Sequence, residues 1–306
     1  MLYDVALWAI ALVIGIALQR RDDARRLNRA IWNGYFFTLS PAVVLFAYST
    51  IPVGRGLVES LTLVAATSWT VLGLGLALGR LVGRSRQERG AIALCAAWGN
   101  TAALGYPLAA LAYGQRGLAL QALYAQFAFG VPAIAVSTTV ARLHGAARER
   151  EATASAFDWR RFVLRNPPLV AAAVAIALRV RGVDVHAIVR PVGHVAGVVS
   201  GPLGFLQLGL SLPLHRIAHD RGDLTRAAAV LALRHGAAPL MLFGLAAALG
   251  VDMPGVFVLA MAAPVAFHLV TLASVFDVRA DLVRLLVVVS TIGAVGAIVA
   301  GVALSR

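Results

Sequence analysis

Few polar side chains lie deep in the apolar parts of this sequence, and one of them, Asn100, is placed where it could bind an anion. It belongs to residues 99–107, Gly-Asn-Thr-Ala-Ala-Leu-Gly-Tyr-Pro, at the centre of an apolar run over residues 91–113. The run is about long enough to cross a bilayer as one helix, but glycine weakens a helix and proline removes a backbone donor. We therefore predict a helix interrupted at membrane depth, carrying an amide that can donate to a carboxylate.

The interruption has two interpretations. Irregular backbone at membrane depth survives only where protein or a water-filled cavity surrounds it, and in carriers such interruptions hold the substrate. The partial positive charge at the start of a half-helix also suits an anionic substrate. The alternative is a kinked packing helix with small residues at a helix–helix contact, in which Asn100 only caps the half-helix. Both roles of Asn100 can hold together.

Three other side chains inside apolar runs could take part in chemistry. Arg234 could bind a carboxylate through both arms of its guanidinium group, or it could extend along the helix to the membrane interface. His235 and His268 could relay a proton near neutral pH, or they could be hydrogen-bonded packing residues.

Weaker candidates complete the set. Gln126 and Gln207 are amides that line a path or bridge helices, and Glu59 opens an apolar run close to Arg55. A role for Glu59 in gating is the remote alternative to simple exposure to outer water.

His215 and His219 have the i, i+4 spacing of two metal ligands on a helix, but Arg216 replaces the glutamate of the H-E-x-x-H motif. We therefore expect a solvated loop there and no metal site.

Composition places the chain in a membrane. Of its 306 residues, 60% are hydrophobic and 13% are charged, against about 25% charged in soluble domains. The net charge is +13, and all 27 basic residues counted in it are arginines. All of these arginines except Arg234 fall between apolar runs, so topology explains them and no nucleic-acid partner is expected. The single Cys95 cannot form an internal disulfide, and no cleavable signal peptide is apparent before the first run.

Ten apolar spans account for the chain, near residues 4–19, 31–50, 57–79, 90–113, 117–140, 166–180, 191–213, 226–249, 254–276 and 284–304. Twenty of the 27 arginines lie in the odd-numbered connections, and six lie in the even-numbered connections or at the C-terminus. The excess of arginine marks the cytoplasmic side. We therefore predict an all-α polytopic protein with both termini in the periplasm.

Ten spans divide into two halves of five, residues 1–140 and 163–306 of a single transmembrane unit. An odd number of spans per half predicts inverted topology. The ninth span carries Pro264 near its middle, so each half has an interruption in its fourth span. We predict that Asn100, the backbone around Thr101 and Gly105 with the neighbouring Pro107, and the opposing Pro264 form the substrate site, together with His268 and Arg234.

Residues 99–108, followed by Tyr113-Gly114, resemble the most specific motif of the auxin efflux carrier family, which includes bacterial malonate and malate carriers and plant auxin exporters. Further family positions follow in order: Asn166-Pro167-Pro168, residues 202–212, Arg234 five residues before Pro239, and Pro264 with Ala273, Phe276, Asp277 and Val278. The ninth span departs from the pattern, because small polar residues common in relatives are missing and His268 is present. This departure bears on the substrate more than on the fold.

The resemblance implies a secondary carrier in a bacterial inner membrane that moves a small organic anion, auxin-like or malonate/malate-like, by elevator-type alternating access. It also implies the architecture of bile-acid symporters and sodium/proton antiporters, with two interrupted helices crossing in a mobile core. That core would contain spans three to five and eight to ten. Spans one, two, six and seven would form a scaffold that dimerises.

Two other classes compete with a carrier. An intramembrane enzyme is disfavoured because no paired acids, zincin motif or Ser/His/Asp set occurs at membrane depth. A non-transporting receptor on the same scaffold remains an alternative. The sequence has no lysine and no phosphate-binding loop, so ATP is not the expected driver and no cofactor is expected. Coupling to protons, coupling to sodium and uniport remain open.

The arginine distribution generates a test of topology. Reporter fusions at both ends should place the N-terminus and the C-terminus in the periplasm, because the arginine-rich connections stay in the cytoplasm. A cytoplasmic C-terminus would remove the arrangement of two inverted halves.

Overall fold

A computed structural model shows that the chain is built from helices and their connections over the residues that the structure describes, 2–146, 165–183, 185–212, 214 and 221–304. Helices are expected here, because a backbone surrounded by lipid must satisfy its hydrogen bonds within the protein. The all-α prediction is therefore confirmed. The inverted repeat and the number of ten spans stay predictions.

Within the described residues, five uninterrupted helical stretches are long and apolar enough to cross a membrane. They are Ala24–Thr50, Arg55–Val82, Ala187–Ser211, Arg221–Leu249 and Ala280–Ile298, and the shorter apolar helices are Tyr3–Leu18 and Pro167–Val180. The predicted fourth and ninth spans are each divided into shorter helices. These lengths and compositions support a multi-pass membrane protein.

The chain divides into two compact units, each with its own packing. Unit 1 comprises the described residues of Met1–Gly54, Thr101–Gln126 and Asp158–Leu212, and unit 2 comprises those of Arg55–Asn100, Phe127–Phe157 and Pro213–Arg306. Unit 1 thus holds the predicted spans one, two, six and seven together with residues 101–126, which the predicted scaffold does not include. The chain passes from unit 2 to unit 1 between Asn100 and Thr101.

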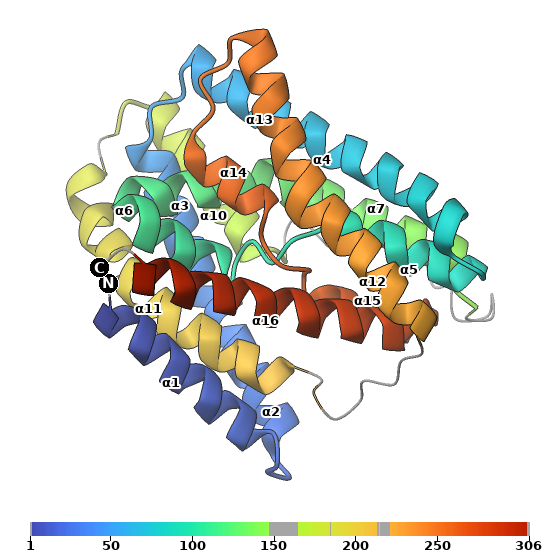
Figure 1. Cartoon of the computed structure of the whole chain (residues 1–306). Coiled ribbons are helices and arrows are strands. Elements are labelled where there is room, and N and C mark those ends of the chain that lie inside the picture. The colour runs from blue at the N-terminus through green and yellow to red at the C-terminus, as the bar shows by residue number, and fades with distance from the viewer. Residues whose placement is uncertain (1, 147–164, 184, 213, 215–220, 305–306) are drawn as a thin grey trace. The chain divides into compact units, whose positions relative to one another are not determined.

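Unit 1 is built on the pairing of α1 and α11, which lie side by side in Figure 1. Gly15 of α1 and Gly209 of α11 face each other so closely that a methyl group on Gly209 would lie 2.9 Å from the Cα atom of Gly15. Small residues at such contacts let helices in membranes pack backbone to backbone. The helices of unit 1 are α1 (Leu2–Leu18), α2 (Ala24–Gly34), η1 (Tyr35–Leu39), α3 (Ser40–Thr50), α6 (Gly105–Tyr124), α10 (Pro167–Val180) and α11 (His186–Ser211).

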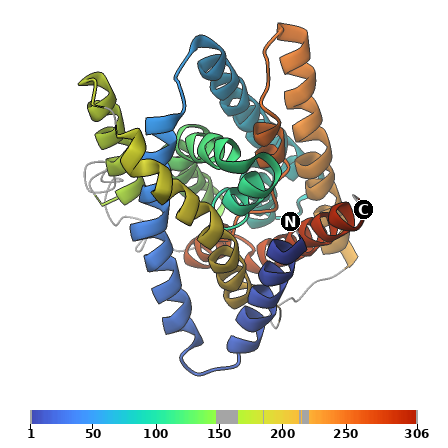
Figure 2. The same ribbon diagram turned by 90° about the vertical axis from the view of Figure 1, so that its left-hand side faces the viewer.

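The second predicted span begins earlier than expected. Helix α2 begins at Ala24, so Arg25, Arg26 and Arg29 lie on a helix and not in a loop. Figure 2 shows α2, η1 and α3 as one continuous rod. The π-helical turn η1 precedes Pro41, whose missing N–H group and bulky ring disturb the regular helix before it.

Two local features of unit 1 follow from residue type, although the sequence analysis named these residues only as part of the family resemblance. Asn166 caps α10, since its side-chain oxygen accepts a hydrogen bond from the Leu169 N–H group at 3.3 Å, and two prolines follow in the first turn. Gly114 adopts φ 63° and ψ −153° inside α6. Only glycine takes this conformation readily, so Gly114 turns the chain from the predicted fourth span into the fifth.

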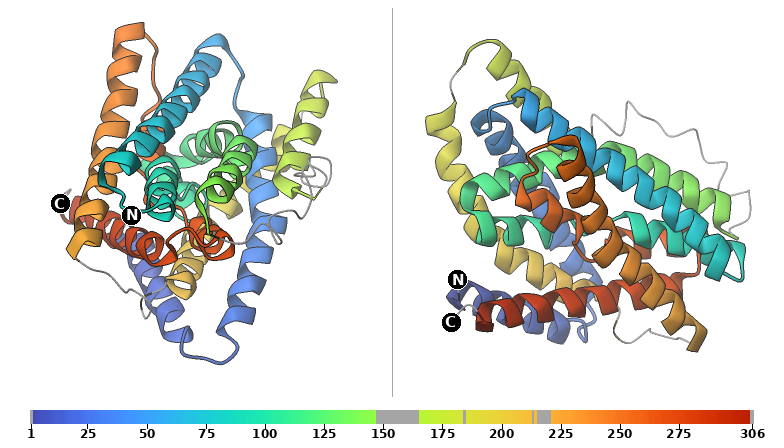
Figure 3. Two further views of the ribbon diagram at one scale, coloured as in Figure 1. Left: turned by 90° about the vertical axis from the view of Figure 1, so that its right-hand side faces the viewer. Right: turned by 45° about the horizontal axis from the view of Figure 1, so that its top comes forward.

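Unit 2 begins with α4, which turns back into α5 at residues 83–85, as Figure 3 shows. Its central apolar cluster includes Ile92, Leu94 and Leu286, which are almost completely buried. The remaining helices are α4 (Arg55–Val82), α5 (Arg86–Ala97), η2 (Ala125–Gly130, at the border with unit 1), α7 (Val131–His144), α12 (Arg221–Leu231), η4 (Ala232–Ala237), α13 (Ala238–Leu249), α14 (Gly255–Met261), α15 (His268–Phe276) and α16 (Ala280–Leu304).

The close contact of α1 with α11 can be tested with a methyl group. Gly209→Ala should lower the free energy of unfolding by about 1–3 kcal/mol, because the new carbon meets backbone atoms that cannot move aside. Thermal unfolding of the purified protein measures the change. The control is Gly73→Ala on α4, where no atom lies within 4 Å of the added carbon. Equal melting temperatures for both variants would contradict this packing.

Candidate functional site

Two helix interruptions lie where the sequence predicts them. Helix α5 ends at Ala97 and α6 begins at Gly105, while α14 ends at Met261 and α15 begins at His268. Gly105 and Pro107 belong to the first turn of α6 and not to the irregular segment. Proline is tolerated there, because the first N–H groups of a helix have no acceptor within the helix.

The two interruptions pair with each other inside unit 2. The Asn100 N–H group donates to the Pro264 carbonyl at 2.7 Å, and the Ala266 N–H group donates to the Trp98 carbonyl at 3.1 Å. Between these two bonds, Gly99 and Val265 form an isolated antiparallel bridge. Each interruption thus provides hydrogen-bond partners for peptide groups of the other, which hydrocarbon could not provide.

Arg234 binds one carbonyl from the last turn of α5, just before the first interruption, and one from the second interruption. Its Nε atom donates to the Ala263 carbonyl at 2.7 Å, and Nη1 donates to the Ala96 carbonyl at 3.0 Å. Only 1% of the residue is exposed. Gly99 packs so tightly against this side chain that a Cβ atom there would collide with Nη2. The guanidinium group therefore points into the paired interruptions and not along the helix to a surface.

The π-helical segment η4 presents Arg234 and His235 to the same interruption. His235 Nδ1 lies 2.9 Å from the Ala262 carbonyl, next to the carbonyl that Arg234 binds. Pro239 follows η4 at the start of α13 and disturbs the regular helix before it. Such π turns are frequent at functional sites. In the sequence, the sign of this one is the proline that follows Arg234 and His235 by a few residues.

The side chain of Asn100 remains available after these contacts. The residue is 7% exposed, and no described residue accepts a hydrogen bond from its Nδ2 atom. A buried donor without an acceptor costs about 1–3 kcal/mol. On the neighbouring side of the pairing, the Val265 N–H group is satisfied by Ser290 Oγ of α16 at 3.0 Å. The Asn100 amide is therefore a buried donor of this site that has no acceptor among the described residues.

The residues that follow Asn100 belong to unit 1 and are satisfied within it. The Thr101 carbonyl accepts from Gln121 Nε2 at 3.0 Å, and the Ala102 carbonyl accepts from the Tyr35 hydroxyl at 3.0 Å. Tyr35 stacks on Tyr106 with ring centroids 6.3 Å apart. The sequence analysis did not single out Gln121 or Tyr35, whose signals are a buried amide and a buried hydroxyl.

The other predicted site residues lie in different surroundings. His268 is the first residue of α15, directly after the second interruption. In unit 1, Gln126 hydrogen-bonds Tyr106, and Gln207 is buried on α11. Glu59 accepts a hydrogen bond from Arg55 Nε at 2.7 Å at an exposed helix start.

The predicted loop histidines, His215 and His219, lie outside the described residues. Among the described residues, no group of three or more metal-ligating side chains comes together.

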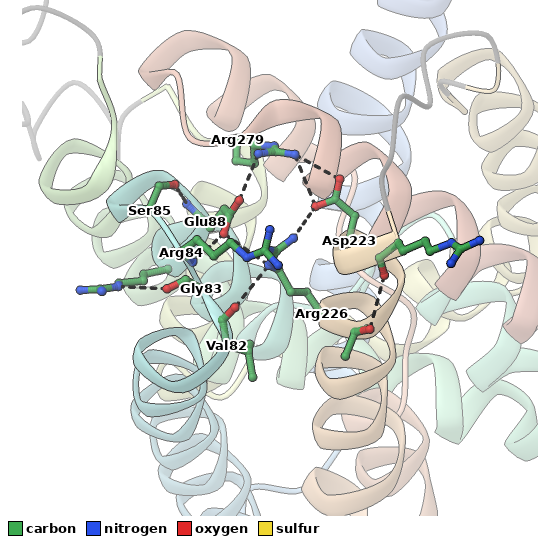
Figure 4. A network of polar contacts seen from close by, with 11 residues as sticks. Val82, Gly83, Arg84, Ser85, Glu88, Asp223, Arg226 and Arg279 are labelled. Atoms are coloured by element: carbon green, nitrogen blue, oxygen red, sulfur yellow. Dashed lines mark hydrogen bonds and ion pairs between the residues drawn. The ribbon is translucent and has the colours of Figure 1, made fainter.

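A network of four charges, three of them buried, is a feature of unit 2 that the sequence analysis did not identify (Figure 4). It joins Glu88 of α5, Asp223 and Arg226 of α12, and Arg279 of the link between α15 and α16. Each carboxylate faces both guanidinium groups. The distances are 2.9 Å for Arg226–Asp223, 3.3 Å for Arg226–Glu88, and 3.1 Å for Arg279 with each carboxylate.

Main-chain contacts complete this network. Glu88 accepts a hydrogen bond from the Arg84 N–H group at 2.7 Å, while Arg226 Nε lies 3.3 Å from the Val82 carbonyl. Arg279 has φ 33°, and a non-glycine residue in such a region costs about 1–3 kcal/mol unless its surroundings compensate. Its two ion pairs supply that compensation. The network thus ties the starts of α5 and α12 to the exit of α15.

Sequence signals for the network existed but were local. Ser85 and Glu88 have the spacing of a capping box, and the Ser85 hydroxyl accepts from the Glu88 N–H group at 3.1 Å. Asp223 and Arg226 have the i, i+3 spacing of a helical ion pair. Contact between the two pairs depends on tertiary packing. Arg226 and Arg279, which the sequence analysis assigned to cytoplasmic connections, thus also form contacts within unit 2.

Comparison with known proteins identifies the family of the chain. A family model described as membrane transport protein matches residues 57–299, which include both interruptions. The chain is therefore a membrane transport protein. It belongs to the auxin efflux carrier family, as the motif at residues 99–108 indicates. No curated protein matches the chain in sequence.

The charge network generates a prediction about stability. Asp223→Asn removes one of the two carboxylates that face Arg226 and Arg279, so that Glu88 alone balances the two guanidinium groups. It should lower the free energy of unfolding by about 3–5 kcal/mol, measured by thermal or denaturant unfolding in detergent.

The matched control is Asp281→Asn. Asp281 pairs with Arg284 at 2.6 Å, but its side chain is 46% exposed, so the loss should be about 0–1 kcal/mol. A loss for Asp223→Asn no larger than for Asp281→Asn would show that the network does not hold unit 2 together.

Proposed function

We propose that this membrane transport protein is a secondary carrier that moves a small organic anion with a carboxylate group by alternating access. Its substrate would bind at the paired interruptions. The family supports transport across a membrane, and the site chemistry supports the substrate class. The predicted contributions of Thr101, Gly105, Pro107 and His268 are part of this proposal.

The observation that carries the proposal is the buried amide of Asn100 with no acceptor among the described residues. A carboxylate is a strong acceptor and would satisfy it. An uncharged donor can hold an anion without the desolvation cost of a buried acid or base. The main-chain pairing at Pro264 fixes the backbone from which this amide extends.

The alternatives differ in coupling and in output. A sodium- or proton-coupled carrier of the bile-acid symporter type would use the same site, with His235 or His268 as the titratable groups. A receptor would bind the anion without moving it. We further propose a bacterial inner-membrane location with periplasmic termini, and a homodimer formed through predicted spans one, two, six and seven.

A first screen identifies the substrate class. Thermal stability of the purified protein should rise with one or more mono- or dicarboxylates, because a ligand that binds only the folded state stabilises it. Uptake into proteoliposomes of each stabilising compound then separates a carrier from a receptor. Binding without any transport in either direction would favour the receptor.

The decisive variant is Asn100→Ala. It should weaken carboxylate binding by about tenfold to 100-fold, since a hydrogen bond to a charged group contributes about 1.5–3 kcal/mol. Asn100→Asp should weaken it further, because a carboxylate of the same size repels an anion. Binding is measured by titration calorimetry on protein that elutes as a single species.

The matched control is Asn28→Ala, which removes an amide that already pairs with Ser211 in unit 1 at 3.0 Å. This change should leave substrate affinity unaltered. Wild-type affinity in Asn100→Ala would mean that the amide does not bind the substrate.

A further inference from the structure

Arg234 is a buried charge in unit 2 that hydrogen-bonds main-chain carbonyl groups of two other segments. Its Nη1 atom donates to the Ala96 carbonyl at the end of α5 at 3.0 Å, and its Nε atom donates to the Ala263 carbonyl of the second interruption at 2.7 Å. The Ala96 carbonyl is in the last turn of α5, where carbonyl groups have no partner within the helix. The side chain thus joins two segments that are far apart in sequence.

The positive charge of Arg234 is favourable beside these carbonyl groups. The C-terminal end of a helix carries a partial negative charge, and the interruption after α14 directs the Ala263 carbonyl to the same guanidinium group. A buried positive charge is costly unless oxygen atoms surround it. The Ala96 and Ala263 carbonyl groups provide such oxygen atoms, so charge and backbone stabilise each other.

In carriers with interrupted helices, unwound carbonyls and half-helix C-terminal ends are the groups that coordinate a coupling cation. Hard cations such as sodium take oxygen ligands of this kind. Here a guanidinium group attached to the chain binds them. Gly99 leaves no space for a side chain beside Nη2, so the backbone closes directly over the charge.

We propose that Arg234 is a built-in cation of the paired interruptions. It positions the two segments by binding one carbonyl from each, and it takes the place of a bound sodium ion there. Substrate binding therefore does not require sodium at this position. This last consequence rests on the proposed function, whereas the positioning role does not.

The test compares cations in the absence of substrate. Wild-type protein should melt at the same temperature in sodium chloride and in choline chloride of equal ionic strength. Arg234→Met keeps an unbranched side chain but removes the charge, and it should melt at least about 5 °C lower. Millimolar guanidinium chloride or sodium chloride, but not choline chloride, should restore part of that loss with saturation.

The matched control is Arg284→Met, which removes an arginine that pairs with Asp281 on α16. Its melting temperature should not recover with guanidinium or sodium. Arg234→Lys, which keeps the charge but not the planar fork, should lie between wild type and Arg234→Met. If Arg234→Met does not fold, Arg234→Lys serves as the variant, with partial rescue by guanidinium expected.

Several results would overturn the proposal. They are saturable stabilisation of the wild type by sodium over choline, a wild-type melting temperature in Arg234→Met, and a loss that neither guanidinium nor sodium restores. None of these measurements involves the substrate. Failure of Asn100→Ala to weaken carboxylate binding would instead refute the proposed function and leave the role of Arg234 intact.

Discussion

The constraint on which this structure depends is the need to satisfy peptide groups where helices stop inside an apolar protein. Residues 98–104 and 262–267 leave N–H and C=O groups that lipid cannot bond. Unit 2 meets the need by pairing the two segments through Asn100 with Pro264 and Ala266 with Trp98. Side chains from η4 and α16 then bind several of the groups that this pairing leaves.

The same unit holds the surrounding helices with charge. The network of Glu88, Asp223, Arg226 and Arg279 ties together the starts of α5 and α12 and the exit of α15. Helix α5 leads directly into the first interruption, while α12 continues into η4, which carries the carbonyl-binding side chains. A rigid framework at these ends keeps the paired segments in register. Pre-organised donors bind a ligand with a smaller loss of conformational entropy.

The site combines a neutral donor with a charge that is already occupied. The Nδ2 atom of Asn100 has no acceptor among the described residues, whereas Nε and Nη1 of Arg234 already donate to carbonyl groups. An arginine in an apolar span suggests direct contact with an anionic substrate. Arg234 holds the backbone, and in our proposal the Asn100 amide binds the substrate, so the two tasks fall to different side chains.

The sequence by itself determined the helical membrane class, the two interruptions and the family, because composition, glycine, asparagine and proline act through local backbone preferences. The cap at Asn166 and the turn at Gly114 also follow from local preferences, although the structure was needed to identify them. Only the tertiary structure decided that Arg234 binds Ala96 and Ala263, and that Glu88 meets Arg226 and Arg279. These contacts join residues far apart in the chain, and the spacing of residues along one segment carries no information about which other segment packs against it.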